Sequence, residues 1–600
     1  MSKKDNSKKG ISRRNFIKVT SVGLGMSAFG FAPIHRAIAE TKFLQQIKWD
    51  KEVDIVAVGA GPAGAGAALK SVLLGNEAII LEKSPAYGGT AIKSGGVMWV
   101  PKNRAMRAAN ISDPKIDAMK YMCKTAYPNK YNTNSATLGL SELEYKLIET
   151  YYDRASEVVD EFTSVRALDL TFWPSIDGTG PAPDYMADMP ENVVKRGRSI
   201  APIPLNGAMA GFVPFPMGFD LMQRMQKALE AHGIKTYYKH RVNRIIEDET
   251  GRVIGVSALN NNKEVYFKAR KGVIFGSGGF AHNAEMVAKY LKGPIFGGGT
   301  LKECEGDLVN MAIEIGADLS NMENAWWDQI VPEMRLKPYN TVPADVFMVP
   351  GDSMIFVNKF GKRIWNEKDQ YNTRGQCHFI DGKKGGDWPN ILVFMIYDQR
   401  TVDYFGSPPG SGMLEMLSFI PAKNHVDNAA HVVKGNTLNE LKNAVAGKLS
   451  QYVRDGEVPD MQLDRKFVST LEETIERYNR FAVQGVDEDF FRGSYMIDRS
   501  YHGPRRPGNN FPNPTMYPIS NRGPYYSTVL MPGSLGTKGG PKINEKAQVL
   551  DVNGNVIPGL YAAGNCSGHP AAESYWGGGA TIGTAMVYGY LAAVDANRNY

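Results

Sequence analysis

The first residues with recognisable chemistry form a short glycine-rich segment, Gly59-Ala60-Gly61-Pro62-Ala63-Gly64. Its spacing is that of a dinucleotide-binding turn, in which Gly59 permits the tight turn, Gly61 lets the backbone approach a pyrophosphate and Gly64 lets a helix pack on a strand. The N-terminus of the following helix offers unpaired N–H groups to phosphate. Glu82 comes 18 residues after Gly64, where a carboxylate can accept hydrogen bonds from ribose hydroxyls. The pattern predicts a dinucleotide site.

A second glycine-rich stretch favours FAD over NAD. Tyr87-Gly88-Gly89-Thr90 and Ser94-Gly95-Gly96 come soon after Glu82 and can run along the extended ribityl portion of a flavin. Near the C-terminus, a helix beginning in Gly577–Gly583 would direct its dipole at the flavin ring and favour the charge of a reduced flavin. We therefore predict FAD contacts at Gly59, Gly61, Pro62, Ala63, Gly64, Glu82, Lys83, Gly88, Gly89, Thr90, Ser94, Gly95, Gly96, Val242, Gly278, Gly279, Gly564, Asn565, Ala580, Thr581 and Ile582.

These segments must be positioned by alternating strands and helices. Val53–Val58 is a β-branched run typical of a buried parallel strand, an Ala-rich helical stretch follows to about Leu74, and Ala78–Leu81 is typical of a second strand. Gly272–Phe275 is expected to be a further strand and Ala580–Ala593 a closing helix. The predicted fold class is α/β, with a Rossmann-type FAD-binding domain and an inserted α+β cap domain that carries catalytic residues.

The length of 600 residues exceeds what one compact core usually holds, so we expect more than one domain. Residues 40–300 are assigned to the first part of the FAD-binding domain. Residues 301–514 are rich in aromatic residues, Met and Pro and lack the strand–helix–strand rhythm, so they are assigned to the cap. Residues 515–600 are assigned to the C-terminal part of the FAD-binding domain.

Residues 1–39 carry the features of a twin-arginine export signal. Ser12-Arg13-Arg14-Asn15-Phe16-Ile17-Lys18 is followed by a moderately apolar stretch and then by Ala37-Ile38-Ala39, which has the form of a signal-peptidase site. We therefore predict that this segment is removed, that the twin-arginine translocase is a partner during export, and that the protein is periplasmic or otherwise exported.

Removal of that segment changes the charge balance. The whole chain carries 69 Lys and Arg and 62 Asp and Glu, and residues 1–39 hold eight of the basic and one of the acidic residues, which leaves 61 of each. A chain without net charge is not attracted electrostatically to the phosphates of nucleic acid, so no nucleic-acid partner is predicted.

The four cysteines, Cys123, Cys304, Cys377 and Cys566, form no Cys-x-x-Cys pair, haem-attachment motif or zinc pattern. We therefore predict no metal site. Electrons are expected to be exchanged with a separate acceptor or donor, such as a quinone or a cytochrome.

The motifs together resemble the fumarate reductase/succinate dehydrogenase flavoprotein superfamily, and within it most of all the 3-ketosteroid Δ1-dehydrogenase branch. The resemblance implies a GR2-like FAD-binding domain, and Gly89 stands near the position where relatives with covalent FAD carry a His, so non-covalent FAD is expected. It covers about residues 50–100, 235–285, 350–375 and 520–595. The matching segments are Gly88-Gly89-Thr90, Ser94-Gly95-Gly96-Val97-Met98-Trp99-Val100-Pro101, Leu560-Tyr561-Ala562-Ala563-Gly564-Asn565 and Gly579-Ala580-Thr581-Ile582-Gly583.

Three ionic groups of the fumarate reductases are replaced in this chain. Their proton-relaying Arg matches Tyr371, their carboxylate-clamping Arg matches Tyr575, and a His before their Thr-x-Gly-Gly turn matches Gly536. A dicarboxylate would lose charge-assisted contacts here, whereas an unpaired buried Arg would be costly beside a neutral carbonyl. Tyr575 and the backbone N–H of Gly579 can instead donate to a ketone oxygen, like the donors of an oxyanion hole.

The resemblance also implies a mechanism on an uncharged ketone, with 3-ketosteroids as the leading substrates. In the family the residue matching Tyr371 is the base, which removes a proton next to the ketone while the neighbouring carbon releases a hydride to flavin N5. The reference pKa of a phenol is about 10, so this base needs a lowered pKa or a second hydroxyl that relays the proton. Tyr185 is the candidate for that hydroxyl. The family's turn reads Tyr-Pro-Gly-Pro-Gly, and the bulk of Trp576 in this chain leaves the substrate open.

Two other readings of the sequence stay open. The first is an exported flavin-dependent reductase of an activated C=C bond, which would use the same residues in the opposite direction. If the loop register shifts by three residues, Arg374 takes the proton-relay position and favours such a reductase. The second is a non-enzymatic electron-transfer flavoprotein, which predicts a shallow flavin edge and no small-molecule substrate.

Overall fold

The computed structural model describes residues 47–205, 217–334, 345–383, 388–408, 418–456, 458 and 460–598. The chain divides into two compact units, Met1–Lys48 and Trp49–Tyr600, and every element below belongs to the second. The predicted export signal at residues 1–39 lies outside the described residues.

The predicted strand–helix–strand unit is present. Strand β1 (Lys51–Val58) pairs in parallel with β2 (Ala78–Glu82), and helix α2 (Pro62–Leu73) connects them. Gly61 caps α2 with an extended conformation and Pro62 is its first residue, a position where a missing N–H costs nothing. The turn between β1 and α2 is therefore the one expected for a dinucleotide.

This unit lies in an eight-stranded sheet with the order β17-β18-β9-β1-β2-β6, to which β8 is added beside β9 and β7 beside β8. The predicted strand at Gly272–Phe275 is the end of β9, and β18 pairs with it in parallel. The remaining strands of the sheet are β6 (Lys235–Tyr238), β7 (Arg241–Glu247), β8 (Val253–Asn260), β9 (Lys263–Phe275), β17 (Gln548–Leu550) and β18 (Val556–Ala562).

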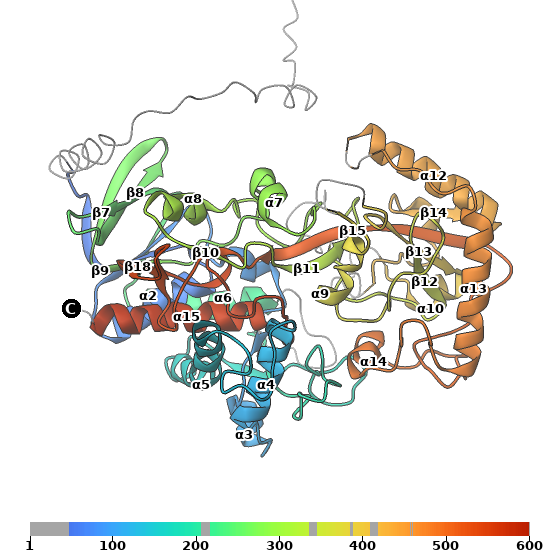
Figure 1. The fold of residues 1–600 in the computed structure, drawn as a ribbon, viewed down its shortest axis with the longest axis horizontal. Helices are drawn as coiled ribbons and strands as arrows, with labels where there is room; N and C mark the ends of the chain where they lie inside the picture. Colours follow the sequence, from blue (N-terminus) through green and yellow to red (C-terminus); the bar gives the residue numbers. More distant parts are fainter. Residues whose placement is uncertain are drawn as a thin grey trace, which may run out of the picture. The chain divides into compact units, whose positions relative to one another are not determined.

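Helices cover this sheet, and the predicted closing helix is among them. Helix α15 (Ala580–Arg598) lies along α2, and α5 (Glu142–Ser164) lies beside α15 (Figure 1). Ser141 and Glu144 form a capping box that starts α5. The neighbouring helices are α3 (Arg104–Ala108), α4 (Lys115–Ala126) and α6 (Met217–Ala231), and a small sheet of order β3-β5-β4 consists of β3 (Met98–Trp99), β4 (Leu170–Phe172) and β5 (Ser199–Pro202).

A second sheet has the order β11-β15-β13-β12, with β14 also paired to β15. All its strand pairs are antiparallel, and it has hydrophobic clusters separate from the large one around α2 and α15. Its strands are β11 (Ala325–Ile330), β12 (Met354–Val357), β13 (Val393–Asp398), β14 (Val432–Gly435) and β15 (Tyr525–Thr537). The accompanying helices are α7 (Ala284–Tyr290), α9 (Tyr371–Arg374), α10 (Gln399–Phe405), α12 (Leu438–Arg454), α13 (Phe467–Gln484) and α14 (Met496–His502). Helix α8 (Asp307–Glu314) instead packs against β7 of the first sheet.

Strand β15 connects the two parts of the fold. The sequence places residues 515–600 with the FAD-binding domain, yet Tyr525–Thr537 pairs with β11, β13 and β14 of the second sheet (Figure 1). The strand after it, β16 (Gly540–Pro541), pairs with β10 (Leu319–Ser320). The domain boundaries stay a prediction, and these pairings give β15 to the second sheet.

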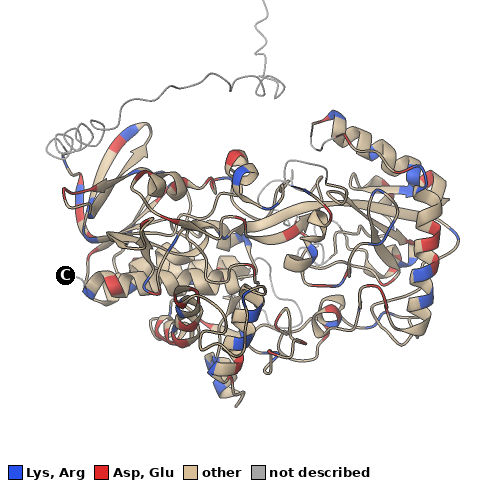
Figure 2. Cartoon of the chain, viewed as in Figure 1, with Lys and Arg blue, Asp and Glu red and all other residues tan. Residues whose placement is uncertain are grey.

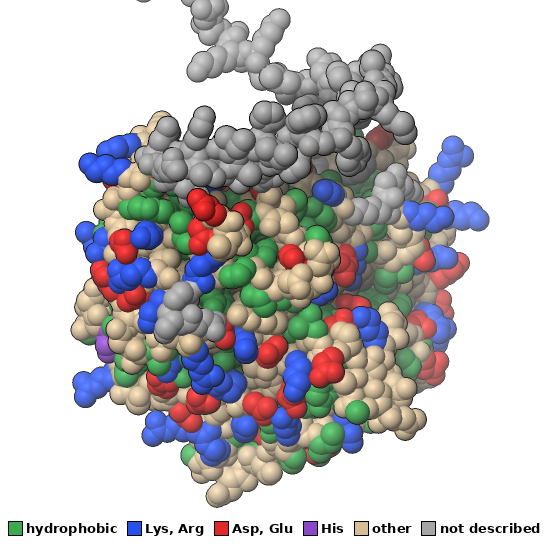
Figure 3. Space-filling model, turned by 60° about the vertical axis from the view of Figure 1, so that its left-hand side comes forward, with side chains coloured by type: hydrophobic (Ala, Val, Ile, Leu, Met, Phe, Trp, Pro, Cys, Tyr) green, Lys and Arg blue, Asp and Glu red, His purple; other side chains and the backbone are tan. Residues whose placement is uncertain are grey.

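Charged side chains of both signs are distributed over the molecule. Figure 2 shows both acidic and basic side chains along α13. On the face drawn in Figure 3, basic and acidic side chains are interspersed with hydrophobic ones. None of the helices in the described ranges combines the length and the apolar character needed to cross a bilayer.

Candidate functional site

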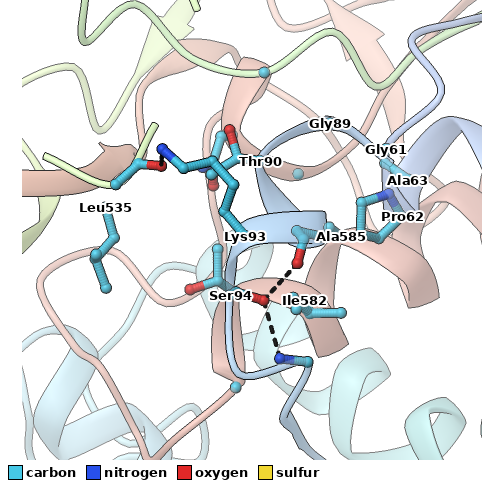
Figure 4. A pocket seen from close by; sticks show the side chains of 18 of the residues that line it. Gly61, Pro62, Ala63, Gly89, Thr90, Lys93, Ser94, Leu535, Ile582 and Ala585 are labelled. Atoms are coloured by element: carbon cyan, nitrogen blue, oxygen red, sulfur yellow. Dashed lines mark hydrogen bonds between the residues drawn. The ribbon is translucent and has the colours of Figure 1, made fainter. Parts of the chain in front are cut away.

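One large pocket begins at the glycine-rich turn, near the residues that Figure 4 labels, and extends to a group of tyrosines. It lies at the carboxyl ends of β1 and β9, where open α/β sheets bind ligands. All four predicted catalytic residues, Tyr185, Tyr371, Tyr575 and Gly579, line it. So do seventeen of the predicted cofactor residues: Gly59, Gly61, Pro62, Ala63, Glu82, Lys83, Gly89, Thr90, Ser94, Gly95, Gly96, Val242, Gly278, Gly564, Asn565, Thr581 and Ile582.

Four predicted cofactor residues do not line the pocket. Gly64 lies under the turn, where a Cβ would be 1.9 Å from the Gly59 carbonyl oxygen, so its part is helix packing. Gly88 donates its N–H to the Ala60 carbonyl at 3.0 Å, and Gly279 accepts from the Gly306 N–H at 3.0 Å. Ala580 is buried as the first residue of α15. These residues shape the loops around the pocket instead of facing it.

The end of the pocket beside the glycine-rich turn has the hydrogen-bonding groups and the space that a dinucleotide needs. The Glu82 carboxylate is buried and accepts the Ala60 and Ser84 N–H groups, both at 2.7 Å. Burial raises the pKa of Glu82, and these two hydrogen bonds oppose the rise. A Cβ added at Gly61 would meet nothing closer than the Gly89 Cα at 4.0 Å, so the backbone here is open to a pyrophosphate. The residues present fit FAD.

The second glycine-rich loop is held by its own side chains (Figure 4). Gly89–Lys93 forms a short 3-10 helix. The Ser94 hydroxyl donates to the Ala91 carbonyl at 2.7 Å and accepts from the Gly96 N–H at 3.0 Å. Lys93, which lines the pocket and which the sequence reasoning did not single out, donates to the Gly299 carbonyl at 3.3 Å. The loop therefore presents a fixed wall to the cofactor.

The tyrosines at the other end touch one another. The Tyr185 hydroxyl donates to the Tyr371 oxygen at 2.6 Å. The ring centres of Tyr185 and Tyr575 are 5.0 Å apart, and those of Tyr371 and Tyr575 are 5.4 Å apart, all edge to face. Tyr371 is the first residue of α9, and α9 packs on β11. Phenols distant in the chain are thus gathered around one space.

Burial governs the ionisation of these phenols. It raises the pKa of Tyr371 well above its ordinary value, and the hydrogen bond from Tyr185 is the main effect in the opposite direction. Of the two routes that the sequence allows for the base, the lowered pKa is not found, whereas the second hydroxyl is in place. Tyr371 is therefore a neutral phenol at neutral pH, and the Tyr185 O–H is placed to stabilise its phenolate.

The two predicted ketone donors lie side by side. Burial raises the pKa of Tyr575, and hydrogen bonds from the Thr581 hydroxyl, Tyr371 and the Gly579 N–H oppose the rise. The Thr581 bond is 3.2 Å long. Gly579 has φ +93°, and a Cβ there would lie 2.3 Å from the Val97 carbonyl, so a side chain is excluded. The Gly579 N–H thus contacts the Tyr575 oxygen, and both residues line the same end of the pocket.

Comparison with known proteins agrees with this geometry. A family model described as an FAD binding domain matches residues 54–582. The chain belongs to this family of FAD-binding flavoproteins.

Similar flavoproteins include 3-oxosteroid 1-dehydrogenase of Mycolicibacterium smegmatis, which is 31% identical over 91% of this chain and 97% of its own length. The 4-oxocyclohexanecarboxylate 2-dehydrogenase of Sinomonas cyclohexanicum is 28% identical over 90% of this chain and 92% of its own. The solved structure of 3-ketosteroid Δ1-dehydrogenase from Sterolibacterium denitrificans matches the fold with a TM-score of 0.73 at 23% identity, over 92% of this chain and 100% of that one. The flavoprotein is thus an FAD-dependent oxidoreductase related to the 3-oxosteroid 1-dehydrogenases.

Arg374 of the flavoprotein does not take the proton-relay position. Its buried guanidinium donates to the Gln329 side chain and to the Asp369 carbonyl, each at 2.7 Å, and to the Val346 carbonyl. It is not among the residues lining the pocket, and in the part of the chain that the structure describes no arginine lines it. Its role here is to join β11 to the segments on either side.

The bulk of Trp576 lies away from the pocket. Its ring is fully buried, 5.3 Å from the ring of Trp99, and its Nε1 donates to the Met122 carbonyl at 3.2 Å. Trp576 is therefore not among the residues that line the pocket. Gly536 has φ +144°, and a Cβ there would lie 2.3 Å from the Asn565 side-chain nitrogen, so the His of the fumarate reductases has no room.

Two further aromatic residues, which no motif identifies as catalytic, belong to this site. Tyr501, on α14, stacks on Tyr371 with ring centres 6.5 Å apart, and Phe347 meets the edge of the same ring at 5.3 Å. Both line the pocket. No motif surrounds either residue, so only the packing of α14 and of the segment before β12 reveals them.

Proposed function

We propose that this flavoprotein removes two hydrogens from a CH–CH bond beside an uncharged ketone, with 3-ketosteroids as the leading substrates. The observation that carries the proposal is the convergence of Tyr185, Tyr371 and Tyr575 in a pocket that, among the described residues, no arginine lines. Phenols donate to a neutral oxygen without leaving a buried charge unpaired.

The ketone oxygen binds between the Tyr575 hydroxyl and the Gly579 N–H. Both donors are fixed before the substrate arrives, since Thr581 holds the phenol and the Val97 backbone fixes the turn. Charge grows on the ketone oxygen as the adjacent carbon loses its proton, so preorganised donors lower the barrier more than they strengthen substrate binding. This pair makes the neighbouring C–H bond acidic.

Tyr371 receives the proton, with Tyr185 as its partner. Tyr371 acts in its phenolate form, which the 2.6 Å bond from the Tyr185 O–H stabilises, and it becomes a neutral phenol when it takes the proton from the carbon next to the ketone. When bound, FAD supplies the acceptor for the hydride that leaves the neighbouring carbon. The aromatic walls around these groups exclude water.

The related proteins support a cyclic ketone as the substrate class. One relative is named for 3-oxosteroids and another for 4-oxocyclohexanecarboxylate, and both names describe a ketone in a six-membered ring. The apolar pocket residues Phe347, Ile497 and Leu535 suit the hydrocarbon part of such a molecule.

Anaerobic mixing of the FAD-loaded enzyme with substrate tests the proposal. A 1,2-saturated 3-ketosteroid and 4-oxocyclohexanecarboxylate are compared by the loss of oxidised-flavin absorbance. Rapid bleaching by the steroid supports the proposal. Bleaching by 4-oxocyclohexanecarboxylate alone would show that the substrate is a smaller cyclic ketone and not a steroid. If no ketone bleaches the flavin, and pre-reduced enzyme is instead reoxidised by an unsaturated acid, the enzyme is a C=C reductase.

We further propose that the enzyme is exported by the twin-arginine pathway and exchanges electrons with a separate quinone or cytochrome. The motif around Arg13 and Arg14 supports export. The double variant Arg13→Lys/Arg14→Lys should leave the FAD-loaded protein in the cytoplasm, and normal export of the variant contradicts the assignment. Reoxidation of the reduced enzyme by a quinone and by a cytochrome, measured side by side, identifies the class of acceptor.

A further inference from the structure

A lysine lies behind the ketone donors, outside the pocket. Lys538 is fully buried in the turn that follows β15. Its Nζ donates to the Ser574 carbonyl at 2.5 Å and stands 4.1 Å from the centre of the Trp326 ring. A cation over a tryptophan face is an attractive arrangement, and it is strongest away from water.

Both contacts of Lys538 lead directly to Tyr575. Ser574 is the residue before Tyr575, so fixing its carbonyl fixes the peptide from which the tyrosine projects. The Trp326 ring meets the Tyr575 ring edge to face, with centres 4.6 Å apart. The Trp326 Nε1 donates to the Asn565 side chain at 2.9 Å, which holds the indole in place. One amine thus supports the tyrosine through its backbone and through its ring.

Burying a lysine here is costly, because an amine loses its hydration and gains few partners. Burial lowers the pKa of Lys538 well below its ordinary value, nearby Lys292 lowers it further, and Glu573 opposes both. The neighbouring His569 adds no second positive charge, since burial and Lys538 lower its pKa well below its ordinary value. Because burying Lys538 costs free energy, its contacts with Ser574 and Trp326 are expected to have a function.

We propose that Lys538 is a positioning residue of the ketone site, which sets the place of the Tyr575 hydroxyl by holding the Ser574 carbonyl and the Trp326 ring. This inference rests on the proposed function.

The test compares two substitutions of similar size. Lys538→Met keeps the length of the side chain and removes the donor, whereas Lys538→Gln keeps an N–H donor. Lys292→Met is the matched control, because Lys292 lies 5.3 Å from the ring of the neighbouring Trp327 and is partly buried, but it touches neither Ser574 nor the pocket. Flavin spectra verify FAD loading, and kcat and KM are measured with the ketone that reduces the wild-type flavin.

We expect Lys538→Met to lower kcat about tenfold or more at nearly unchanged KM, since a small displacement of a catalytic group costs turnover more than binding. Lys538→Gln should recover part of the loss, and Lys292→Met should stay within about twofold of wild type. Equal activity of Lys538→Met and wild type overturns the inference while leaving the proposed function intact.

A double-mutant cycle separates positioning from general destabilisation. If Lys538 acts through Tyr575, its loss in the Tyr575→Phe background should cost less than about twofold. A full tenfold loss in that background shows an independent role and overturns the inference. Should the Met variant fail to load FAD, the Gln variant is used in the same cycle. If no ketone reduces the wild-type flavin, the proposed function falls and this inference falls with it.

Discussion

The two ends of the pocket are built in different ways. At the cofactor end, glycines, backbone groups and the Glu82 carboxylate from residues 58–97 form much of the wall, and Gly278 and Gly564 add to it. At the substrate end, side chains from separate parts of the chain meet, and the hydrogen-bonded pair Tyr185 and Tyr371 is 186 residues apart. The first end depends on local backbone geometry, and the second on how distant elements pack.

This difference predicts that substitutions at the two ends affect separate properties. Changes at the phenols should abolish chemistry while FAD stays bound, whereas changes at the turn should weaken FAD binding. A phenol variant that loses FAD would contradict this separation of the two ends.

The largest expected effect is that of Tyr371→Phe. Removing the group that takes the proton should slow flavin reduction about a thousandfold, as for loss of a general base, with an unchanged spectrum of bound FAD. Stopped-flow traces under anaerobic conditions measure this. Traces equal to those of wild type would show that another group is the base.

Tyr575→Phe should lower turnover about a hundredfold, as for loss of one oxyanion donor. Tyr397→Phe is the matched control, because Tyr397 is also a buried tyrosine, lies in the second sheet away from the pocket, and has its hydroxyl 3.2 Å from that of Thr528. Steady-state turnover with the ketone compares the two variants. Near-normal turnover of Tyr575→Phe would contradict its part in binding the ketone.

At the other end, Gly61→Ala should weaken FAD binding about tenfold. The added methyl has room in the protein alone but occupies the space through which the pyrophosphate approaches. Titration of the apoprotein with FAD measures the affinity. Gly447→Ala, in α12 with open space around it, is the control and should leave the affinity unchanged. An unaltered affinity for Gly61→Ala would place the cofactor elsewhere.

The smallest expected effect is on the free energy of unfolding, through the buried carboxyl of Asp498. Burial raises the pKa of Asp498 to about 7, and this carboxyl accepts from the Asn366 side chain at 2.9 Å, in the loop before Tyr371. Because its pKa is raised on folding, the proton stabilises the protein at low pH, and that contribution is lost as the pH rises from about 4 to about 7. Asp498→Asn, which keeps an acceptor without charge, should therefore be more stable than wild type by about 1 kcal/mol at pH 8 and by less at pH 5.

Denaturant unfolding at the two pH values tests this. Asp487→Asn supplies the opposite case, since its pairing with Arg363 lowers the pKa of the Asp487 carboxyl against the effect of burial. That stabilisation is fully present above the ordinary pKa of 3.8 and is lost only below it, so Asp487→Asn should be about equally destabilising at pH 8 and at pH 5. The same pH trend in both variants would contradict the assignment of Asp498.

The local sequence was enough to predict the strand, turn and helix that begin the cofactor site. The strand, the turn from Gly59 to Gly64 and helix α2 are contiguous, and the conformations that glycine allows are set by neighbours in the chain. The family resemblance also pointed to Tyr371 and Tyr575, because each lies in a recognisable short segment.

The hydrogen bonds among the phenols, and the residues that pack against them, could be seen only in the folded structure. That Tyr185 donates to Tyr371, that burial raises the pKa of Tyr371, that Trp576 turns into the core and that Lys538 supports Tyr575 all depend on contacts between distant segments. Likewise β15 joined the second sheet through pairing partners far along the chain. Hydrogen bonding and burial are properties of neighbours in space, so a local pattern names the chemistry but leaves its arrangement to the folded chain.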